Sequence, residues 1–260
     1  QTTSVITDED QPNEYGLDVS CNLGSIDIHE ATKNENFEKL VSTAMRLLTN
    51  VSTMTEIINV PSVSKANKVM HSVGLGVMNL HGHLVQSGIR YGSKESIQFI
   101  DAFMEALNFY SLKASMETAK AKKETFYRYE DSDYATGVYF EKYLSKNKNI
   151  HSAIVRDALN NVPSITQDMW VQLKNDVKKY GLFHSYRLAI APTGSISYIR
   201  SCTASISPVT ERVEVRDYAD SRTIYPMPFL TNDNKELYTE AYDVNPYELI
   251  DLYAAAQQHV

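Results

Sequence analysis

The chain has 260 residues, of which 43% are hydrophobic and 22% charged, so it is long enough to bury a substantial core. Its net charge of -7 disfavours a general nucleic-acid binder, because such proteins gain affinity by placing Lys and Arg against phosphates. Two cysteines far apart, no basic-then-apolar leader and no apolar run of membrane-spanning length predict a protein of the reducing cytoplasm.

The first half of the chain predicts a helix and then a strand-to-helix turn. Residues 1–18 are polar and show little periodicity. From 37 to 58 apolar residues recur at helical spacing and stop before a proline, which predicts one long amphipathic helix. The segment 72–78 carries two glycines and is typical of a strand or tight turn that leads into a helix near Leu80.

The rest of the chain alternates helical patterns with short apolar runs. Further helices are predicted at 95–123, 134–145 and 167–180. Short apolar segments lie at 22–28, 187–191 and 206–216. This alternation favours an α/β arrangement with crossover connections.

A hydroxyl-rich loop follows the apolar run at 187–191 and has the composition of a phosphate site. Pro192 ends the run, Gly194 lets the backbone approach a ligand, and Thr193, Ser195 and Ser197 add short donors to the backbone N–H groups. A plain connecting loop is the alternative, because Ser, Thr and Gly cluster in ordinary loops as well.

Four motifs, in the same order along essentially the whole chain, resemble the large subunit of class Ib ribonucleotide reductase. They are Ser-Cys-Asn-Leu-Gly-Ser at 20–25, Val-Gly-Leu-Gly-Val-Met-Asn-Leu-His-Gly at 73–82, Ala-Pro-Thr-Gly-Ser-Ile-Ser at 191–197 and Tyr-Ala-Ala-Ala-Gln-Gln-His at 253–259. The resemblance implies a ten-stranded α/β barrel of two five-stranded halves. Residues 1–260 would then be a helix-rich partial catalytic barrel domain, the second half of that barrel. The regulatory region, the first half and the C-terminal end would lie outside the chain.

The resemblance also implies an activity, the reduction of ribonucleoside diphosphates to deoxyribonucleoside diphosphates for DNA synthesis. In that chemistry a thiyl radical removes the 3′-hydrogen, and two other cysteines supply the reducing equivalents. Cys21 matches one of this redox-active pair, and its partner would come from an earlier strand outside the chain. Such a thiol must be exposed to the substrate cleft and within disulfide reach of its partner. The alternative is a buried cysteine that acts as a small hydrophobe.

The same resemblance assigns the substrate diphosphate to the loop Pro192, Thr193, Gly194, Ser195 and Ile196, through backbone N–H groups and hydroxyls. A helix that starts after the loop would add its positive end. Cys202 departs from the family pattern, and we interpret it as a neutral substitution and not as the partner of Cys21.

Other polar residues predict structure and not chemistry. His71, His81 and His83 lack a nearby carboxylate or cysteine at ligand spacing, so packing or surface roles are favoured and no metal site is predicted. The acidic residues between Glu130 and Asp133 are expected to cap a helix.

By the resemblance, the remaining parts of the reaction come from elsewhere. The radical-bearing cysteine of an Asn-Leu-Cys-x-Glu motif would lie just before Gln1, and the tyrosines that carry the radical would lie beyond Val260. No cofactor is expected on this chain: a dimetal small subunit would supply the radical, and a thioredoxin- or glutaredoxin-like protein would supply electrons. The N-terminal part of the large subunit would be a further partner, and neither nucleic acid nor membrane is expected.

Two origins fit this pattern, a truncated reductase chain or the product of a Bacillus-like or phage gene split by an intron, intein or break. Either would be inactive alone. The alternative of another class is a non-catalytic remnant that acts as a phosphate-binding or interaction domain.

Overall fold

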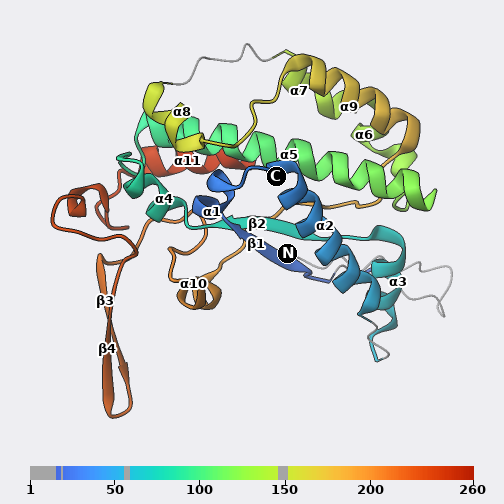
Figure 1. The fold of residues 1–260 in the computed structure, drawn as a ribbon. Coiled ribbons are helices and arrows are strands. Elements are labelled where there is room, and N and C mark those ends of the chain that lie inside the picture. Colours follow the sequence, from blue (N-terminus) through green and yellow to red (C-terminus); the bar gives the residue numbers. More distant parts are fainter. Residues whose placement is uncertain (1–15, 19, 56–58, 146–151) are drawn as a thin grey trace.

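A long helix, α5 (Lys94–Lys122), runs across the molecule and organises its core (Figure 1). The structure is a computed structural model that describes residues 16–18, 20–55, 59–145 and 152–260. The hydroxyl of Ser93 caps the start of α5 by accepting from the Ser96 N–H, and Lys123 ends it in the left-handed conformation. Four helices pack against α5: α2 (Phe37–Met54), α8 (Ala153–Leu159), α9 (Gln167–Tyr180) and α11 (Pro246–Gln257).

A small parallel sheet lies beside this helical layer. β1 (Leu23–Asp27) pairs with β2 (Gly74–Met78), and Leu75 of β2 forms a further parallel bridge to Leu188. The chain between the strands forms α1 (Ile28–Lys33), α2 and α3 (Pro61–Met70). Parallel strands need such a crossover, so the α/β arrangement predicted from the sequence is confirmed for this part of the chain.

The helices cover one face of the sheet. A Cβ built on Gly24 would lie 3.2 Å from the side chain of Leu48 in α2, so Gly24 faces the helices. Leu23 alternates with it along the strand, and is 41% exposed on the other face. Figure 1 shows α2 and α5 on one side of β1 and β2, and α10 (Gly194–Arg200) on the other.

The strands approach closely because β2 is rich in glycine. A Cβ on Gly76 would lie 2.3 Å from the carbonyl oxygen of Ala189, which is closer than real Cβ atoms come to backbone. Gly76 therefore allows the segment that precedes the hydroxyl-rich loop to pack against β2.

Several predicted elements are confirmed. The helices predicted at 95–123 and 167–180 are α5 and α9, the helix expected near Leu80 is α4 (Leu80–Gln86), and the strands at 22–28 and 72–78 are β1 and β2. The helix predicted at 37–58 is α2, which ends at Met54 because Thr55 takes an extended conformation.

The helix predicted at 134–145 is wrong. The structure has short pieces instead: η1 (Tyr129–Asp131), α6 (Asp133–Thr136), η2 (Val138–Phe140) and α7 (Glu141–Leu144). Gly137, with φ of 87°, ends α6. The cap of α6 is the hydroxyl of Ser132 and not a carboxylate, and Asp131 pairs with Arg128 at 2.7 Å.

Two predicted strands are shorter than expected. The segment 187–191 contributes the single bridge at Leu188, because its later residues turn into the loop. In 206–216 a strand begins only at residue 213: β3 (Val213–Tyr218) pairs antiparallel with β4 (Ser221–Pro226) in a hairpin that projects from the body (Figure 1).

The remaining described element is η3 (Lys235–Leu237). No helix among the described residues is both long and apolar enough to span a membrane. The polar opening of the chain falls outside the described residues up to position 15.

Candidate functional site

The hydroxyl-rich segment continues into a helix, as expected, but α10 begins already at Gly194, so Gly194, Ser195 and Ile196 form its first turn and only Pro192 and Thr193 precede it. Thr193 is the N-cap residue of α10 and is buried, and its Oγ1 accepts a 2.7 Å hydrogen bond from the N–H of Ser205. The N–H of Ser197 donates to the carbonyl oxygen of Thr193 at 2.9 Å. The hydroxyl of Ser197 donates to the carbonyl oxygen of Gly194, also at 2.9 Å. The hydroxyls of Thr193 and Ser197 therefore hold the loop in shape.

The outer side of the loop keeps its donors available. The first N–H groups of a helix have no intrahelical partner, which here concerns Gly194, Ser195 and Ile196. All three residues are exposed, as is Pro192. Ser195 adds a hydroxyl at the surface, and nothing lies within 4 Å of a Cβ built on Gly194.

Gly194 and Ser195 border a cavity of about 410 Å³, which we call the α10 cavity. That volume lies within the usual range for small-molecule sites. Its lining combines α10, the segment after it and the hairpin, and it includes Gly194, Ser195, Tyr198, Cys202, Thr203, Ser207, Glu214 and Arg216.

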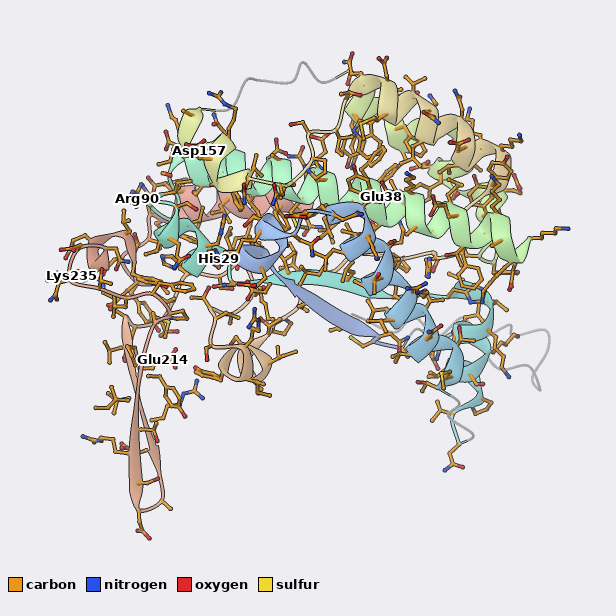
Figure 2. All side chains as sticks on the ribbon, in the orientation of Figure 1. His29, Glu38, Arg90, Asp157, Glu214 and Lys235 are labelled. Carbon is orange, nitrogen blue, oxygen red and sulfur yellow. The ribbon has the colours of Figure 1, made fainter. Side chains whose placement is uncertain are left out.

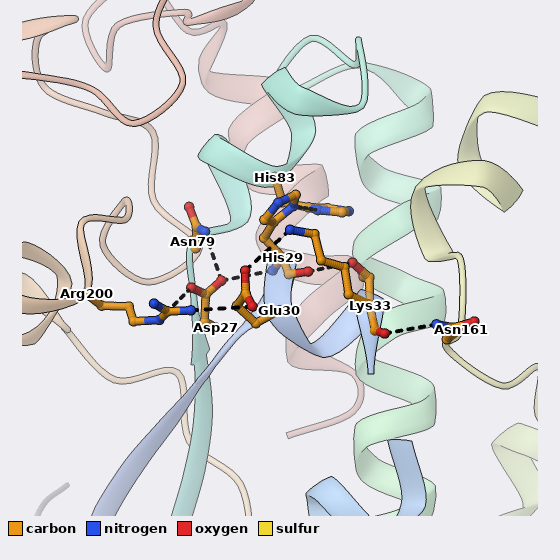
Figure 3. A network of polar contacts seen from close by, with 9 residues as sticks. Asp27, His29, Glu30, Lys33, Asn79, His83, Asn161 and Arg200 are labelled. Carbon is orange, nitrogen blue, oxygen red and sulfur yellow. Dashed lines mark hydrogen bonds and ion pairs between the residues drawn. The ribbon is translucent and has the colours of Figure 1, made fainter. Parts of the chain in front are cut away.

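An ion pair fixes α10 to the carboxyl end of the sheet. The Nε of Arg200 lies 3.3 Å from Oδ2 of Asp27, and its Nη2 lies 3.6 Å from Oε2 of Glu30 (Figure 3). Oδ1 of Asp27 accepts from the N–H of His29 at 3.0 Å and from Nδ2 of Asn79 at 2.9 Å. The end of β1, the start of α1 and the turn after β2 thus converge on one carboxylate.

The segment after α10 is held from the same turn. Asn79 has φ of 72°, and it donates its N–H to the carbonyl of Thr203 at 2.8 Å. The N–H of Gly82 donates to Oγ1 of Thr203 at 3.2 Å. A Cβ on Gly82 would lie 2.3 Å from Oδ1 of Asn79, so a larger residue there would displace the Asn79 side chain.

The hairpin supports the opposite wall of the cavity. Tyr198 of α10 donates its hydroxyl to Oε2 of Glu214 at 2.5 Å, and Arg216 pairs with the same carboxylate at 3.1 Å. The Arg216 guanidinium also donates to the Tyr198 hydroxyl and lies 4.0 Å from the centre of its ring. Glu214 lies where the hairpin meets the body (Figure 2).

Cys21 lies at the amino end of β1, opposite the carboxyl end where Asp27 pairs with Arg200. It is exposed and precedes β1 by two residues. Leu75 pairs with Gly24 on one side and with Leu188 on the other, so Cys21 lies three residues before this level and Pro192 four residues beyond it. At the rise of an extended chain, these seven residues separate Cys21 from Pro192 by roughly 20 Å along the strand direction. The structure does not bring the thiol and the loop into contact.

Cys202 is a buried free thiol in the wall of the α10 cavity. Burial, with the Asp27 carboxylate as a second cause, raises the pKa of this thiol to about 12. Since Cys202 lies beside the end of β1 and Cys21 before its start, the two are at opposite ends of that strand.

The three histidines singled out in the sequence are buried among protein partners. His71 stacks on Phe183 with ring centres 3.8 Å apart, and its Nε2 lies 3.0 Å from Oε1 of Glu124. Nδ1 of His81 accepts from the N–H of Val209 at 3.1 Å, and burial lowers the pKa of His81 to about 4. Among the described residues, no three His, Cys, Asp or Glu side chains gather as metal ligands would.

Sequence reasoning missed the pairing of His83 with His29. Their Nδ1 atoms lie 3.1 Å apart (Figure 3). Nε2 of His83 lies 3.1 Å from the carbonyl oxygen of Ala158. A carbonyl only accepts, so His83 carries its proton on Nε2 and His29 donates from Nδ1. Burial lowers the pKa of His83 to about 4 and also lowers that of His29. No spacing signal in the sequence connects residues 54 positions apart.

Comparison with known proteins gives one consistent result. The family described as "Ribonucleotide reductase, barrel domain" matches residues 6–260. The "Ribonucleoside-diphosphate reductase subunit alpha" of Bacillus subtilis is 48% identical over 257 residues, which cover 99% of this chain and 37% of the relative. The "Ribonucleoside-diphosphate reductase nrdEB subunit alpha" of Bacillus phage SPbeta is 48% identical over 99% of this chain and 24% of its own length.

A more distant relative shows the same coverage. The alpha subunit of ribonucleoside-diphosphate reductase from Mycoplasma pneumoniae is 39% identical over 95% of this chain and 35% of its own length. The chain thus spans 24% to 37% of the length of these relatives.

Proposed function

Because the chain belongs to the ribonucleotide reductase barrel-domain family, we propose that it forms part of the large subunit of a ribonucleoside-diphosphate reductase. We further propose the class Ib type and the second half of a ten-stranded barrel. The parallel order of β1, β2 and the bridge at Leu188 supports the barrel assignment, because successive parallel strands with helices on one face are the unit of such barrels.

The substrate diphosphate binds, in this proposal, at the loop Pro192, Thr193, Gly194, Ser195 and Ile196. The observation that carries it is the α10 cavity, which the exposed residues Gly194 and Ser195 of the first helical turn line. The Thr193 hydroxyl accepts from Ser205 and positions the backbone, while the Ser195 hydroxyl is exposed and available to a phosphate oxygen. Preorganised donors of this kind bind an anion without a large ordering cost.

Cys21 acts, in this proposal, as one of the two reducing thiols. Two thiols are oxidised to a disulfide while the 2′-hydroxyl of the ribose leaves as water and a hydrogen takes its place, so two electrons pass from sulfur to the substrate. The exposure of Cys21 supports this assignment, because the thiol has to reach both the substrate and a second sulfur. Its offset from the loop requires the substrate to lie along the face of the sheet that carries α10, opposite α2 and α5 (Figure 1).

The remaining parts of the reaction are assigned to partners. They are the N-terminal part of the large subunit, a small subunit whose dimetal centre generates the radical, and a thioredoxin- or glutaredoxin-like protein that reduces the disulfide. The cytoplasm, whose thiol buffers keep such a protein reduced, is the compartment that this chemistry requires.

The test is reconstitution with a complementary N-terminal segment of the large subunit and a radical-bearing small subunit. We expect reduction of a nucleoside diphosphate that disappears in a Cys21→Ser chain, while Cys202→Ser retains it. Correct assembly without any reduction would contradict the proposal, and would favour a non-catalytic phosphate-binding remnant if diphosphate still binds.

A further inference from the structure

An ion pair carried by the hairpin, Glu214 with Arg216, lines the α10 cavity. Residues alternate in direction along a strand, so these two side chains share one face of the hairpin. Tyr225 pairs with Glu214 across the hairpin, and its ring lies 5.5 Å from that of Tyr198 in α10. Val215, between the two charged residues, is 50% exposed. The face that carries the ion pair is therefore the one turned towards α10.

The guanidinium of Arg216 is held between residues of the cavity wall. It lies 4.0 Å from the centre of the Tyr198 ring, donates to the Tyr198 hydroxyl, and pairs with Oε2 of Glu214 at 3.1 Å. All three residues line the α10 cavity, and the Arg216 side chain is 40% exposed. A ligand in the cavity can therefore reach the guanidinium.

The charges of the cavity wall show what this arginine can contribute. Among the described residues that line the α10 cavity, Arg216 is the one cation and Glu214 the one carboxylate. The N–H groups and hydroxyls of the loop at 192–196 are neutral, whereas a diphosphate carries several negative charges. A guanidinium presents a planar set of donors that matches two phosphate oxygens at once. Arg216 thus offers the charge that the loop lacks.

We propose that Arg216 binds the diphosphate group of the substrate in the α10 cavity, an inference that rests on the proposed function of the loop. In the structure, Glu214 pairs with the guanidinium. The diphosphate takes the place of this carboxylate, and Glu214 keeps the hydrogen bond that the Tyr198 hydroxyl donates to its Oε2 at 2.5 Å. Glu214 is then a competitor that lowers the affinity for a diphosphate, and Arg216 is the residue that raises it.

These opposite roles provide the test, because substitution of either residue breaks the same ion pair. Arg216→Gln removes the charge that attracts the diphosphate, and Glu214→Gln removes the carboxylate that competes for the guanidinium. Arg216→Lys keeps the charge and loses the planar donor set. Arg222→Gln is the matched control, because Arg222 lies on the same hairpin, pairs with Asp217 at 2.8 Å, and is not part of the cavity lining.

The measurement is the dissociation constant of uridine diphosphate, and of inorganic pyrophosphate as the diphosphate group alone, for the large subunit assembled with its N-terminal segment. Titration calorimetry without the small subunit keeps the nucleotide intact. We expect Arg216→Gln to weaken both ligands about tenfold, the usual effect of losing one charge-assisted hydrogen bond, and Arg216→Lys to weaken them less. Glu214→Gln should bind both at least as tightly as the wild type, and Arg222→Gln should match the wild type.

Two results would overturn the proposal. One is an unchanged affinity in Arg216→Gln; the other is an equal loss in Arg216→Gln and Glu214→Gln, which would mean that the ion pair only holds the hairpin. Gly194→Asp separates this failure from failure of the proposed function. If Gly194→Asp weakens binding while Arg216→Gln does not, the loop binds the diphosphate without Arg216. If Gly194→Asp has no effect, the loop assignment itself fails.

Discussion

Arg200 in the last turn of α10 lies 3.3 Å from Asp27 at the end of β1, so one ion pair connects the proposed phosphate loop to the sheet (Figure 3). The two side chains differ in burial: Asp27 is 10% exposed and Arg200 is 49% exposed. Asp27 also accepts from the His29 N–H and from Asn79. The carboxylate therefore has several structural roles, whereas the arginine mainly holds α10.

This difference predicts unequal effects of two substitutions. Arg200→Gln should lower the free energy of unfolding by less than about 1 kcal/mol, because half-exposed ion pairs contribute little. Asp27→Ala should lower it by about 2 kcal/mol, because it removes a helix cap and leaves Asn79 without its acceptor. Urea denaturation measures both.

Arg200→Gln should nevertheless weaken nucleoside diphosphate binding in the assembled protein. Arg90→Gln is the matched control, because Arg90 is 43% exposed and pairs with Glu248 at 2.8 Å, outside the lining of the α10 cavity. Equal affinities of the two variants would show that the Arg200 pair does not position the loop.

The close approach at Gly76 predicts a large effect of one methyl group. Gly76→Ala would place its Cβ 2.3 Å from the backbone oxygen of Ala189, so we expect a loss of about 3 kcal/mol or more in unfolding free energy. Gly24→Ala is the control, because its Cβ would meet only the Leu48 side chain at 3.2 Å, which can adjust. A similar loss in both variants would contradict the steric explanation.

Hydrophobic periodicity was sufficient to predict the long helices, and local turn chemistry explains where it failed. The apolar stripes of α5 and α9 extend over many turns, so packing and pattern agree. Around Gly137 the apolar residues have helical spacing, but the positive φ of that glycine breaks the helix. The hairpin turn was missed because it places Ala219 at φ of 45°, which is unusual for alanine.

For the candidate site, the sequence predicted which residues form the loop but not what holds it. The order Pro-Thr-Gly-Ser at 192–195 indicates an anion loop by composition alone. The Asp27–Arg200 pair joins segments distant in sequence, and a single sequence carries no signal for such a contact.

The buried histidines predict loss of stability in mild acid. The pKa of His83 falls to about 4 in the folded protein, against about 6.5 in an unfolded chain. The unfolded state then binds more protons between these values, so unfolding free energy decreases as pH falls from about 6.5 towards 4 and levels off below. His81, whose pKa is also lowered to about 4, acts with the same sign.

Urea denaturation of the wild type and of His83→Gln at several pH values measures this effect. The variant keeps a donor near the Ala158 carbonyl and cannot be protonated. Its stability should depend less steeply on pH in that window, by up to about 1.4 kcal/mol per pH unit. Parallel profiles would mean that His83 does not titrate as its burial implies.

The two cysteines should differ strongly in reactivity. Cys21 is exposed, whereas Cys202 is 8% exposed and its thiol pKa is raised to about 12 by burial. Since the thiolate is the nucleophile, iodoacetamide at pH 8 should label Cys21 and leave Cys202 unmodified until the protein unfolds. Mass spectrometry of the labelled peptides distinguishes the two sites.

Nucleoside diphosphate should slow the labelling of Cys21 in the assembled protein if the thiol and the loop serve one substrate. Inorganic phosphate, which is too small to span the sheet, should not. Equal labelling with and without nucleoside diphosphate would separate Cys21 from the loop as functional sites.

A carboxylate at Gly194 should act on the substrate and not on the fold. Nothing lies within 4 Å of a Cβ at this position, and the residue opens α10, so Gly194→Ala and Gly194→Asp should both fold. Gly194→Asp places a negative charge beside the donors of the loop, where it repels a diphosphate at close range. In the reconstituted enzyme we expect its KM for nucleoside diphosphate to rise about tenfold or more, while Gly194→Ala stays near the wild type. Equal KM values for the two variants would exclude this loop from the diphosphate site, because charge is the main difference between them.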